Sequence, residues 1–105
     1  MILTMQELEQ RLERVGIPVA YRQFPRGKAP PPPYLCYLQE NTSNFYADNQ
    51  VYEIVQLYSI ELYTETKRPD LESAVEAALS DFCWEKTEEY LDDEKCYQII
   101  YEIEV

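Results

Sequence analysis

The sequence has no histidine and only two glycines, Gly16 and Gly27. A chain without histidine lacks the side chain that most often acts as a general base near neutral pH. Two separate glycines cannot supply the glycine-rich phosphate-binding loops GxGxxG or GxxxxGK followed by Ser or Thr. We therefore expect no enzymatic activity and no cofactor.

The cysteines are few and scattered: Cys36, Cys83 and Cys96 form no CxxC pair. Their odd number and wide spacing argue against a disulfide framework, and without histidine a zinc site lacks its usual ligands. The acidic triplet at 92–94 lacks the spaced oxygen ligands of a calcium loop. We expect buried, unreactive cysteines, solvated carboxylates and no metal site.

Long apolar runs are also missing, since none approaches the roughly 18 residues that a membrane-spanning helix requires. The first ten residues, MILTMQELEQ, have neither the basic region nor the long apolar stretch of a signal peptide. These features predict a protein that stays in the cytosol where it is made and has no membrane partner.

Basic residues are scarce, with nine Lys and Arg against twenty Asp and Glu, and the formal net charge is −11. Residues 1–33 carry five basic and three acidic groups, a net charge of +2. Residues 34–105 carry four basic and seventeen acidic groups, a net charge of −13. Because an acidic surface repels nucleic-acid phosphates, we expect no sequence-specific nucleic-acid binding.

The chain does have the material for one hydrophobic core. A length of 105 residues with 46 % apolar residues fits a single domain, which we expect to span residues 1–105. Ten of the fourteen aromatic residues are tyrosine. Tyrosine buries a ring while keeping its hydroxyl at a wet edge, so this composition suits half-buried sheets and interfaces.

Two helices are predicted from their ends and their apolar stripes. Thr4 and Glu7 form a capping box at the start of a helix over about residues 5–15, and Gly16 is placed to end it. Pro69 and Asp70 favour the start of a second helix. The stripes consist of Met5, Leu8, Leu12 and Val15 in the first helix and Leu71, Val75, Ala78, Leu79 and Phe82 in the second.

Five segments have the pattern of strands, at residues 17–24, 34–40, 51–65, 84–91 and 95–104. Residues 25–33 (PRGKAPPPP) and the turn formers at 41–49 (NTSNFYADN) predict loops. The resulting order, α-β-β-β-α-β-β, predicts an α+β fold. We expect a largely antiparallel sheet of about five strands with both helices packed on one face.

The segment 51–65 is the most strand-like part of the chain, and at about 15 residues it exceeds the usual strand length. We expect it either to be bent by a bulge or to project beyond the sheet. Its alternation places Tyr52, Ile54, Tyr58, Ile60 and Leu62 on one face, with Glu53, Ser59 and Glu61 on the other.

The four prolines before the second predicted strand allow two interpretations. Pro31-Pro32-Pro33-Tyr34 matches the PPxY pattern that WW domains bind. The same prolines are equally suited to a stiff lead-in, because proline fixes φ and lowers the entropy lost when a strand docks. The alternation of Tyr34, Cys36 and Leu38 favours the lead-in and predicts that these side chains are buried in the sheet.

Four segments occur in an order that resembles one protein family: PPPPYLCY, NFYADNQVYE, YSIELYTETKRPDLESAVEAAL and the C-terminal YQIIYEIEV. Over residues 21–105 the chain is similar to the small tail-completion or tail-terminator proteins, encoded among the head–tail joining genes, of long-tailed phages and prophages of Gram-positive bacteria. The resemblance implies an α+β fold and a ring, commonly a hexamer, where the tail tube meets the head. It also implies a location in the host bacterial cytoplasm during assembly and then in the virion.

The partners that the resemblance implies are further copies of the chain, the tail tube and the head–tail connector proteins. A second hypothesis is a soluble acidic mimic of DNA that binds a basic host protein, and a third is a cytosolic adaptor. For an assembling chain, exposed aromatic residues and the basic N-terminal residues are the best interface candidates. These candidates are Arg22, Arg26, Lys28, Phe45, Tyr46, Asp48 and Asn49.

Overall fold

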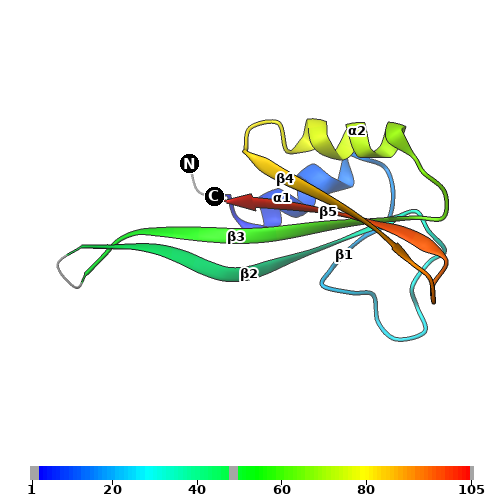
Figure 1. The fold of residues 1–105 in the computed structure, drawn as a ribbon, viewed down its shortest axis with the longest axis horizontal. Coiled ribbons are helices and arrows are strands. Elements are labelled where there is room, and N and C mark those ends of the chain that lie inside the picture. Colours follow the sequence, from blue (N-terminus) through cyan, green and yellow to red (C-terminus); the bar gives the residue numbers. More distant parts are fainter. Residues whose placement is uncertain (1–2, 48–49, 105) are drawn as a thin grey trace.

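The computed structural model describes the backbone of residues 3–47 and 50–104 and the side chains of residues 3–40 and 56–104. Over these residues the chain forms two helices and five strands (Figure 1). The elements are α1 (Met5–Glu13), β1 (Val19–Tyr21), β2 (Tyr34–Ala47), β3 (Gln50–Thr64), α2 (Pro69–Ala78), β4 (Trp84–Leu91) and β5 (Cys96–Glu104). The predicted α+β order is confirmed.

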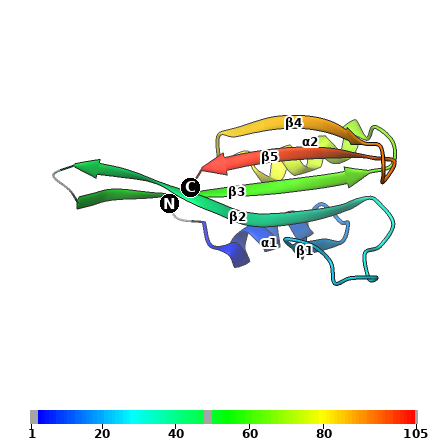
Figure 2. The same cartoon turned by 60° about the horizontal axis from the view of Figure 1, so that its bottom comes forward.

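The strands form one sheet in the order β1-β2-β3-β5-β4 (Figure 2). Every neighbouring pair is antiparallel except β1 and β2, which are parallel. The largely antiparallel sheet is therefore confirmed. The first strand is shorter than predicted, because Arg22 adopts a left-handed backbone with φ of 65° and turns the chain away from β2.

One face of the sheet carries the core. Leu8 and Leu12 of α1 and Leu71 and Val75 of α2 belong to the same buried cluster, so both helices cover this face, as predicted. The register pairs the buried side chains of β2, β3 and β5 in rows across the sheet. The sheet contributes Leu35, Tyr37, Tyr58, Ile60, Leu62, Ile99, Tyr101 and Ile103.

The prediction that Tyr34, Cys36 and Leu38 are all buried in the sheet was wrong for two of the three residues. Leu35 and Tyr37 point toward the helices, while Tyr34, Cys36 and Leu38 lie on the opposite face of the sheet. Of these three, Cys36 is buried and the other two are only half-buried. The sequence YLCYL is apolar at every position, so its alternation carries no information about which set faces the core.

The helix starts follow the sequence closely. The Thr4 Oγ1 accepts a hydrogen bond from the Glu7 backbone N–H at 3.1 Å, as the predicted cap requires. The helix α1 ends at Glu13, two residues before the predicted end. Gly16 then takes φ of 90° and donates its N–H to the Glu13 carbonyl at 3.1 Å, which closes the helix exit.

The predicted loop at 41–49 was wrong over most of its length, because β2 continues to Ala47 and β3 begins at Gln50. Asp48 and Asn49 lie outside the described residues. The strand β3 pairs with β5 only over Leu57–Thr64. Residues 42–47 and 50–56 therefore pair only with each other and project beyond the sheet (Figures 1 and 2).

We call this two-stranded part, residues 42–47 and 50–56, the projecting ladder. It lengthens the molecule, whose extents are 49 × 26 × 22 Å. Its register shifts between Gln39 and Thr42 and again between Phe45 and Tyr46. Both expectations for the long strand are thus met, since the ladder is irregular and it also projects.

A pair of substitutions tests the orientation of β2. Leu35→Ala is expected to lower the free energy of unfolding by about 2–5 kcal/mol, because Leu35 is fully buried in the core. Leu38→Ala, on the opposite face, is expected to cost about 1 kcal/mol or less. Chemical denaturation measures both values, and a loss at Leu38 as large as that at Leu35 would contradict this orientation.

Candidate assembly surfaces

The face of the sheet opposite the helices is uncovered in the described chain, and we call it the open face. Its positions follow from the register, which aligns Cys36 with Glu61 and Ile100 across three strands. The open face mixes apolar and acidic side chains. Its main residues are Tyr34, Cys36, Leu38, Ser59, Glu61, Tyr63, Gln98, Ile100, Glu102, Glu85, Thr87 and Glu89.

Aromatic rings gather at one end of the open face. The rings of Tyr34 and Tyr63 stack with centroids 4.9 Å apart, and Phe24 packs edge-on against Tyr34 at 5.2 Å. The Tyr63 hydroxyl donates to Glu61 at 3.0 Å and accepts from Gln98 at 2.9 Å. These half-buried rings tie the loop after β1 to the sheet.

Burial on this face changes the protonation of several groups. Desolvation raises the pKa of Glu61, with the hydrogen bond from Tyr63 opposing and the charge of Glu40 reinforcing it. Desolvation and the nearby Glu61 raise the pKa of Cys36 to about 11. A thiol with such a high pKa is protonated near neutral pH and is a poor nucleophile.

The other end of the open face is hollowed. A cavity of about 490 Å³ opens where β3, β4 and β5 meet the base of the projecting ladder. Ser59 lies in it and donates a hydrogen bond to Glu40 at 3.1 Å. We call this the acidic hollow and define it by Glu40, Leu57, Ser59, Glu85, Glu102 and Glu104.

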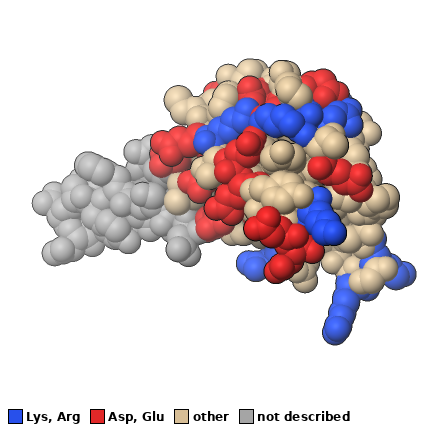
Figure 3. Space-filling view, turned by 45° about the vertical axis from the view of Figure 1, so that its right-hand side comes forward, with Lys and Arg blue, Asp and Glu red and all other residues tan. Residues whose placement is uncertain are grey.

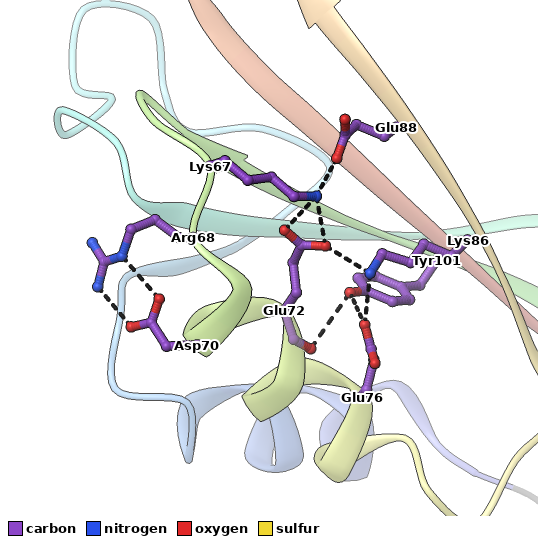
Figure 4. Close-up of polar contacts among 8 residues, drawn as sticks. All are labelled: Lys67, Arg68, Asp70, Glu72, Glu76, Lys86, Glu88 and Tyr101. Carbon is purple, nitrogen blue, oxygen red and sulfur yellow. Dashed lines mark hydrogen bonds and ion pairs between the residues drawn. The ribbon is translucent and has the colours of Figure 1, made fainter.

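The ion pairs among the described side chains are all on the helix side of the sheet. Glu72 of α2 is 4 % exposed and is held by the ammonium groups of Lys67 at 2.8 Å and Lys86 at 2.6 Å (Figure 4). Lys67 also pairs with Glu88, and Lys86 with Glu76 at 2.9 Å. This network fastens α2 to β4 and to the segment before the helix.

The network controls the charge of its carboxylates. Burial alone would raise the pKa of Glu72, but the hydrogen bonds from Lys67 and Lys86 together bring it below the usual range. The pKa of Glu76 is lowered in the same way, with help from the Tyr101 hydroxyl, which donates to it at 2.8 Å. Tyr101 is buried, and desolvation raises its pKa.

The cysteines follow the prediction in part. Cys36 and Cys96 are buried, but Cys83 is exposed, so the expectation of three buried cysteines was wrong there. Cys83 lies in the short segment between α2 and β4, where the neighbouring Phe82 is the side chain that packs against the core. Among the described side chains, no cluster of three metal-ligating residues occurs. None of the described helices is long and apolar enough to span a membrane.

The structure separates the predicted interface residues into two groups. Arg22, Arg26 and Lys28 are exposed in the connection between β1 and β2. Phe45 and Tyr46 belong to β2 in the projecting ladder. In Figures 1 and 2 the two groups lie toward opposite ends of the molecule, so they do not form one site.

The acidic hollow was not among the sites predicted from the sequence. Its carboxylates come from β2, β4 and β5, which are distant in sequence, and only the strand register brings them together. The available signal was the recurrence of Glu in the last two strands, at 85, 88, 89, 102 and 104. Without a known strand order, that recurrence also fits ordinary solvated charge.

Comparison with known proteins gives a fold match. No protein-family model matches the chain, and no curated protein matches it either. The fold matches a chain in a solved structure of the virion of a native gene transfer agent (GTA) particle, with a TM-score of 0.63. The match covers 93 % of this chain and 90 % of that chain at 14 % sequence identity, so it shows a shared fold.

The Glu72 network predicts acid sensitivity. Because the folded pKa of Glu72 is lowered, its contribution is present above the carboxyl's ordinary pKa and is lost as pH falls through the folded value. Glu72→Gln is expected to cost about 2 kcal/mol at pH 7, since two lysines lose a buried partner that is only partly screened. It should also flatten the fall in stability between roughly pH 5 and pH 3.

Glu89→Gln provides the matched control, because Glu89 is exposed and forms no ion pair with a described side chain. Its cost is expected to stay within about 0.5 kcal/mol. Urea unfolding at several pH values measures both variants. If the Glu72 variant loses stability in parallel with the wild type across this range, the network does not carry the pH dependence.

The projecting ladder is expected to be dispensable for folding. Thr42 and Gln56 face each other across β2 and β3. Replacing residues 43–55 with Asn-Gly would join them by a two-residue turn. The free energy of unfolding should change by about 1 kcal/mol or less, because the removed part pairs with neither β5 nor β1. Thermal unfolding followed by circular dichroism checks this, and loss of a cooperative transition would mean that the ladder belongs to the core.

Proposed function

We propose that this chain is a non-enzymatic structural protein of a phage or phage-like virion and acts by self-assembly. The observation that carries the proposal is the fold match with a chain of a gene transfer agent virion, which spans nearly all of both chains. The lack of histidine and of phosphate-binding loops supports a structural role.

The finer proposal is a tail-terminator or tail-completion protein at the head–tail junction, assembled as a ring. The four segments that resemble tail-terminator proteins support it, and so does the shape of the subunit. An isolated two-stranded ladder is marginally stable in water. The projecting ladder therefore gains from contact with a neighbouring subunit, the tail tube or a connector protein.

The charge of the chain also suits this position. DNA passes the head–tail junction of a tailed particle, and an acidic surface that lines the passage would not retain phosphates. The open face carries several carboxylates that form no ion pair with a described side chain. A subunit made in the bacterial cytoplasm would then be incorporated into the virion.

The same carboxylates favour a second candidate function, a soluble mimic of DNA that binds a basic host protein. The two functions differ in valence. A ring subunit binds further copies of itself, whereas a mimic binds its target as a monomer or dimer and covers its acidic face with the target's cations.

Native mass spectrometry and negative-stain electron microscopy of the purified chain distinguish these functions. A ring subunit is expected to give closed particles of one dominant stoichiometry with a central opening wide enough for a DNA duplex. A chain that remains monomeric or dimeric at high protein concentration in low salt would overturn the ring and favour the mimic.

Phe45 and Tyr46 are proposed to contact a neighbouring subunit or the tail tube. The variant Phe45→Ala with Tyr46→Ala is expected to keep the melting temperature but to lose rings, because large aromatic anchors can contribute about 2 kcal/mol or more to an interface. Tyr90→Ala serves as the control, since Tyr90 is a 49 % exposed aromatic residue on β4. Wild-type ring formation by the double variant would remove these two residues from the interface, and unfolding would assign them to the core.

A further inference from the structure

The connection after β1 contains an ordered turn that presents three cations. The Lys28 backbone N–H donates to the Pro25 carbonyl at 2.9 Å, and Gly27 at the third position has φ of 76°, as a type II turn requires. Arg22 donates its backbone N–H to the Tyr37 carbonyl at 2.7 Å. We call residues 22–28 the basic turn.

The cations of the basic turn have no partner within the described chain. Arg22, Arg26 and Lys28 are exposed, and none forms an ion pair with a side chain among residues 3–40 and 56–104. Figure 3 shows basic side chains extending from the lower right of the molecule, where Figure 1 places this connection. Because the turn is already ordered, binding through it costs little conformational entropy.

The acidic hollow presents carboxylates that likewise form no ion pair within the described residues. Glu85 and Glu102 are directly opposite each other in the β4–β5 register, and both are exposed. Like charges at such a position destabilise a sheet. Neither carboxylate forms an ion pair within the described residues. A cation placed between them would relieve a repulsion that the single chain leaves in place.

The hollow also has the shape to receive such a cation. It is concave, with a volume of about 490 Å³, and its lining includes the carboxylates of Glu40, Glu85 and Glu102. A guanidinium group presents several N–H donors in a rigid fork, so it can pair with more than one carboxylate. An arginine or lysine side chain is therefore the chemistry that the hollow fits best.

The basic turn of the same copy cannot serve the hollow. Phe24 packs against Tyr34, which anchors the turn near the start of β2. Glu40 of the hollow lies six residues further along β2, a distance of about 20 Å at the usual rise of a strand. The two complementary surfaces are thus at different ends of one sheet.

We propose that the basic turn of one copy docks into the acidic hollow of a second copy. The contact is head-to-tail, because it joins two different surfaces, and contacts of this kind form a ring when the rotation between neighbours closes. The inference rests on the proposed ring function and adds the residues that join its subunits. Arg26 and Lys28 supply the cations, and Glu85 and Glu102 supply the carboxylates.

Charge reversal tests the contact. Arg26→Glu with Lys28→Glu, and separately Glu85→Lys with Glu102→Lys, are each expected to weaken self-association about tenfold or more. The variant that carries all four changes restores the complementarity and is expected to recover most of the affinity. The control variant Arg14→Glu with Lys95→Glu changes the net charge by the same amount as Arg26→Glu with Lys28→Glu, but at positions outside the basic turn. It should associate nearly as the wild type does.

Sedimentation velocity at about 0.1 M and 1 M salt measures these affinities, because the Debye length falls from about 10 Å to about 3 Å over that range. The wild type should associate more weakly in the higher salt. As an independent measurement, carbodiimide treatment of the wild type should cross-link Lys28 to Glu85 or Glu102 between copies, which mass spectrometry of the peptides detects.

The outcomes separate the two proposals. If the wild type does not self-associate in either salt, the ring function fails and this contact fails with it. If rings form and both reversals weaken them no more than the control does, or the four-change variant recovers nothing, the contact is wrong while the ring function stands. The absence of the cross-link in assembled rings also contradicts the contact.

Discussion

The fold depends on covering one face of β3. Ile60 and Leu62 lie between buried partners on β2 and β5, Tyr58 pairs with the buried Ile103 of β5, and all three belong to the core with both helices. Full burial of each such side chain contributes roughly 1.5–3 kcal/mol. The helices have nine and ten residues and would be marginal alone. Packing against this face therefore stabilises the helices, and the helices in turn shield its apolar side chains from water.

The same constraint determines what stays uncovered. Two short helices cover one face of five strands, so the open face remains without a protein layer in the described chain. Among the described residues, β3 pairs with β5 only over Leu57–Thr64. The first part of β3 is left to pair with β2 alone. The open face and the projecting ladder are thus two consequences of one small core.

The ion pairs differ between the two sides of the sheet. On the helix side, Lys67 and Lys86 are used to hold the buried Glu72, which fixes the position of α2. On the open face the carboxylates receive no such partner among the described side chains. Residues 34–105 contain only four cations, and two of them, Lys67 and Lys86, are engaged in holding Glu72.

The sequence predicted those elements whose ends have a local chemical cause. The Thr4 cap, Pro69 at the start of α2 and the acidic turn between β4 and β5 all form as expected. These signals fixed the fold class, the number of strands and the shared side of the helices. The parallel pairing of β1 with β2 had no local signal, because strand direction depends on the path of the intervening loop.

The predictions from sequence were wrong where the pairing of strands overrode the local preference of the residues. Residues 41–47 contain Asn, Thr and Ser, which favour turns, yet a ladder with β3 supplies backbone hydrogen bonds that keep them extended. The start of β2 is apolar at every position. Its sequence therefore does not show which alternate side chains face the helices. The candidate interface was predictable only as separate exposed residues, since Glu85 and Glu102 become neighbours through the register.

The charge pattern also limits the symmetry of an assembly. A twofold contact whose axis passes near the Glu85–Glu102 pair would place these carboxylates against the same carboxylates of the other copy, and like charges facing each other across an interface cost several kcal/mol. A head-to-tail contact avoids this repulsion, because it offers each acidic face a different surface. Residues 34–105 have a net charge of −13, and the remaining five cations lie in residues 1–33. Since the basic turn holds three of these five cations in an ordered, exposed loop, the charge of a single copy favours repetition in one direction over pairing face to face.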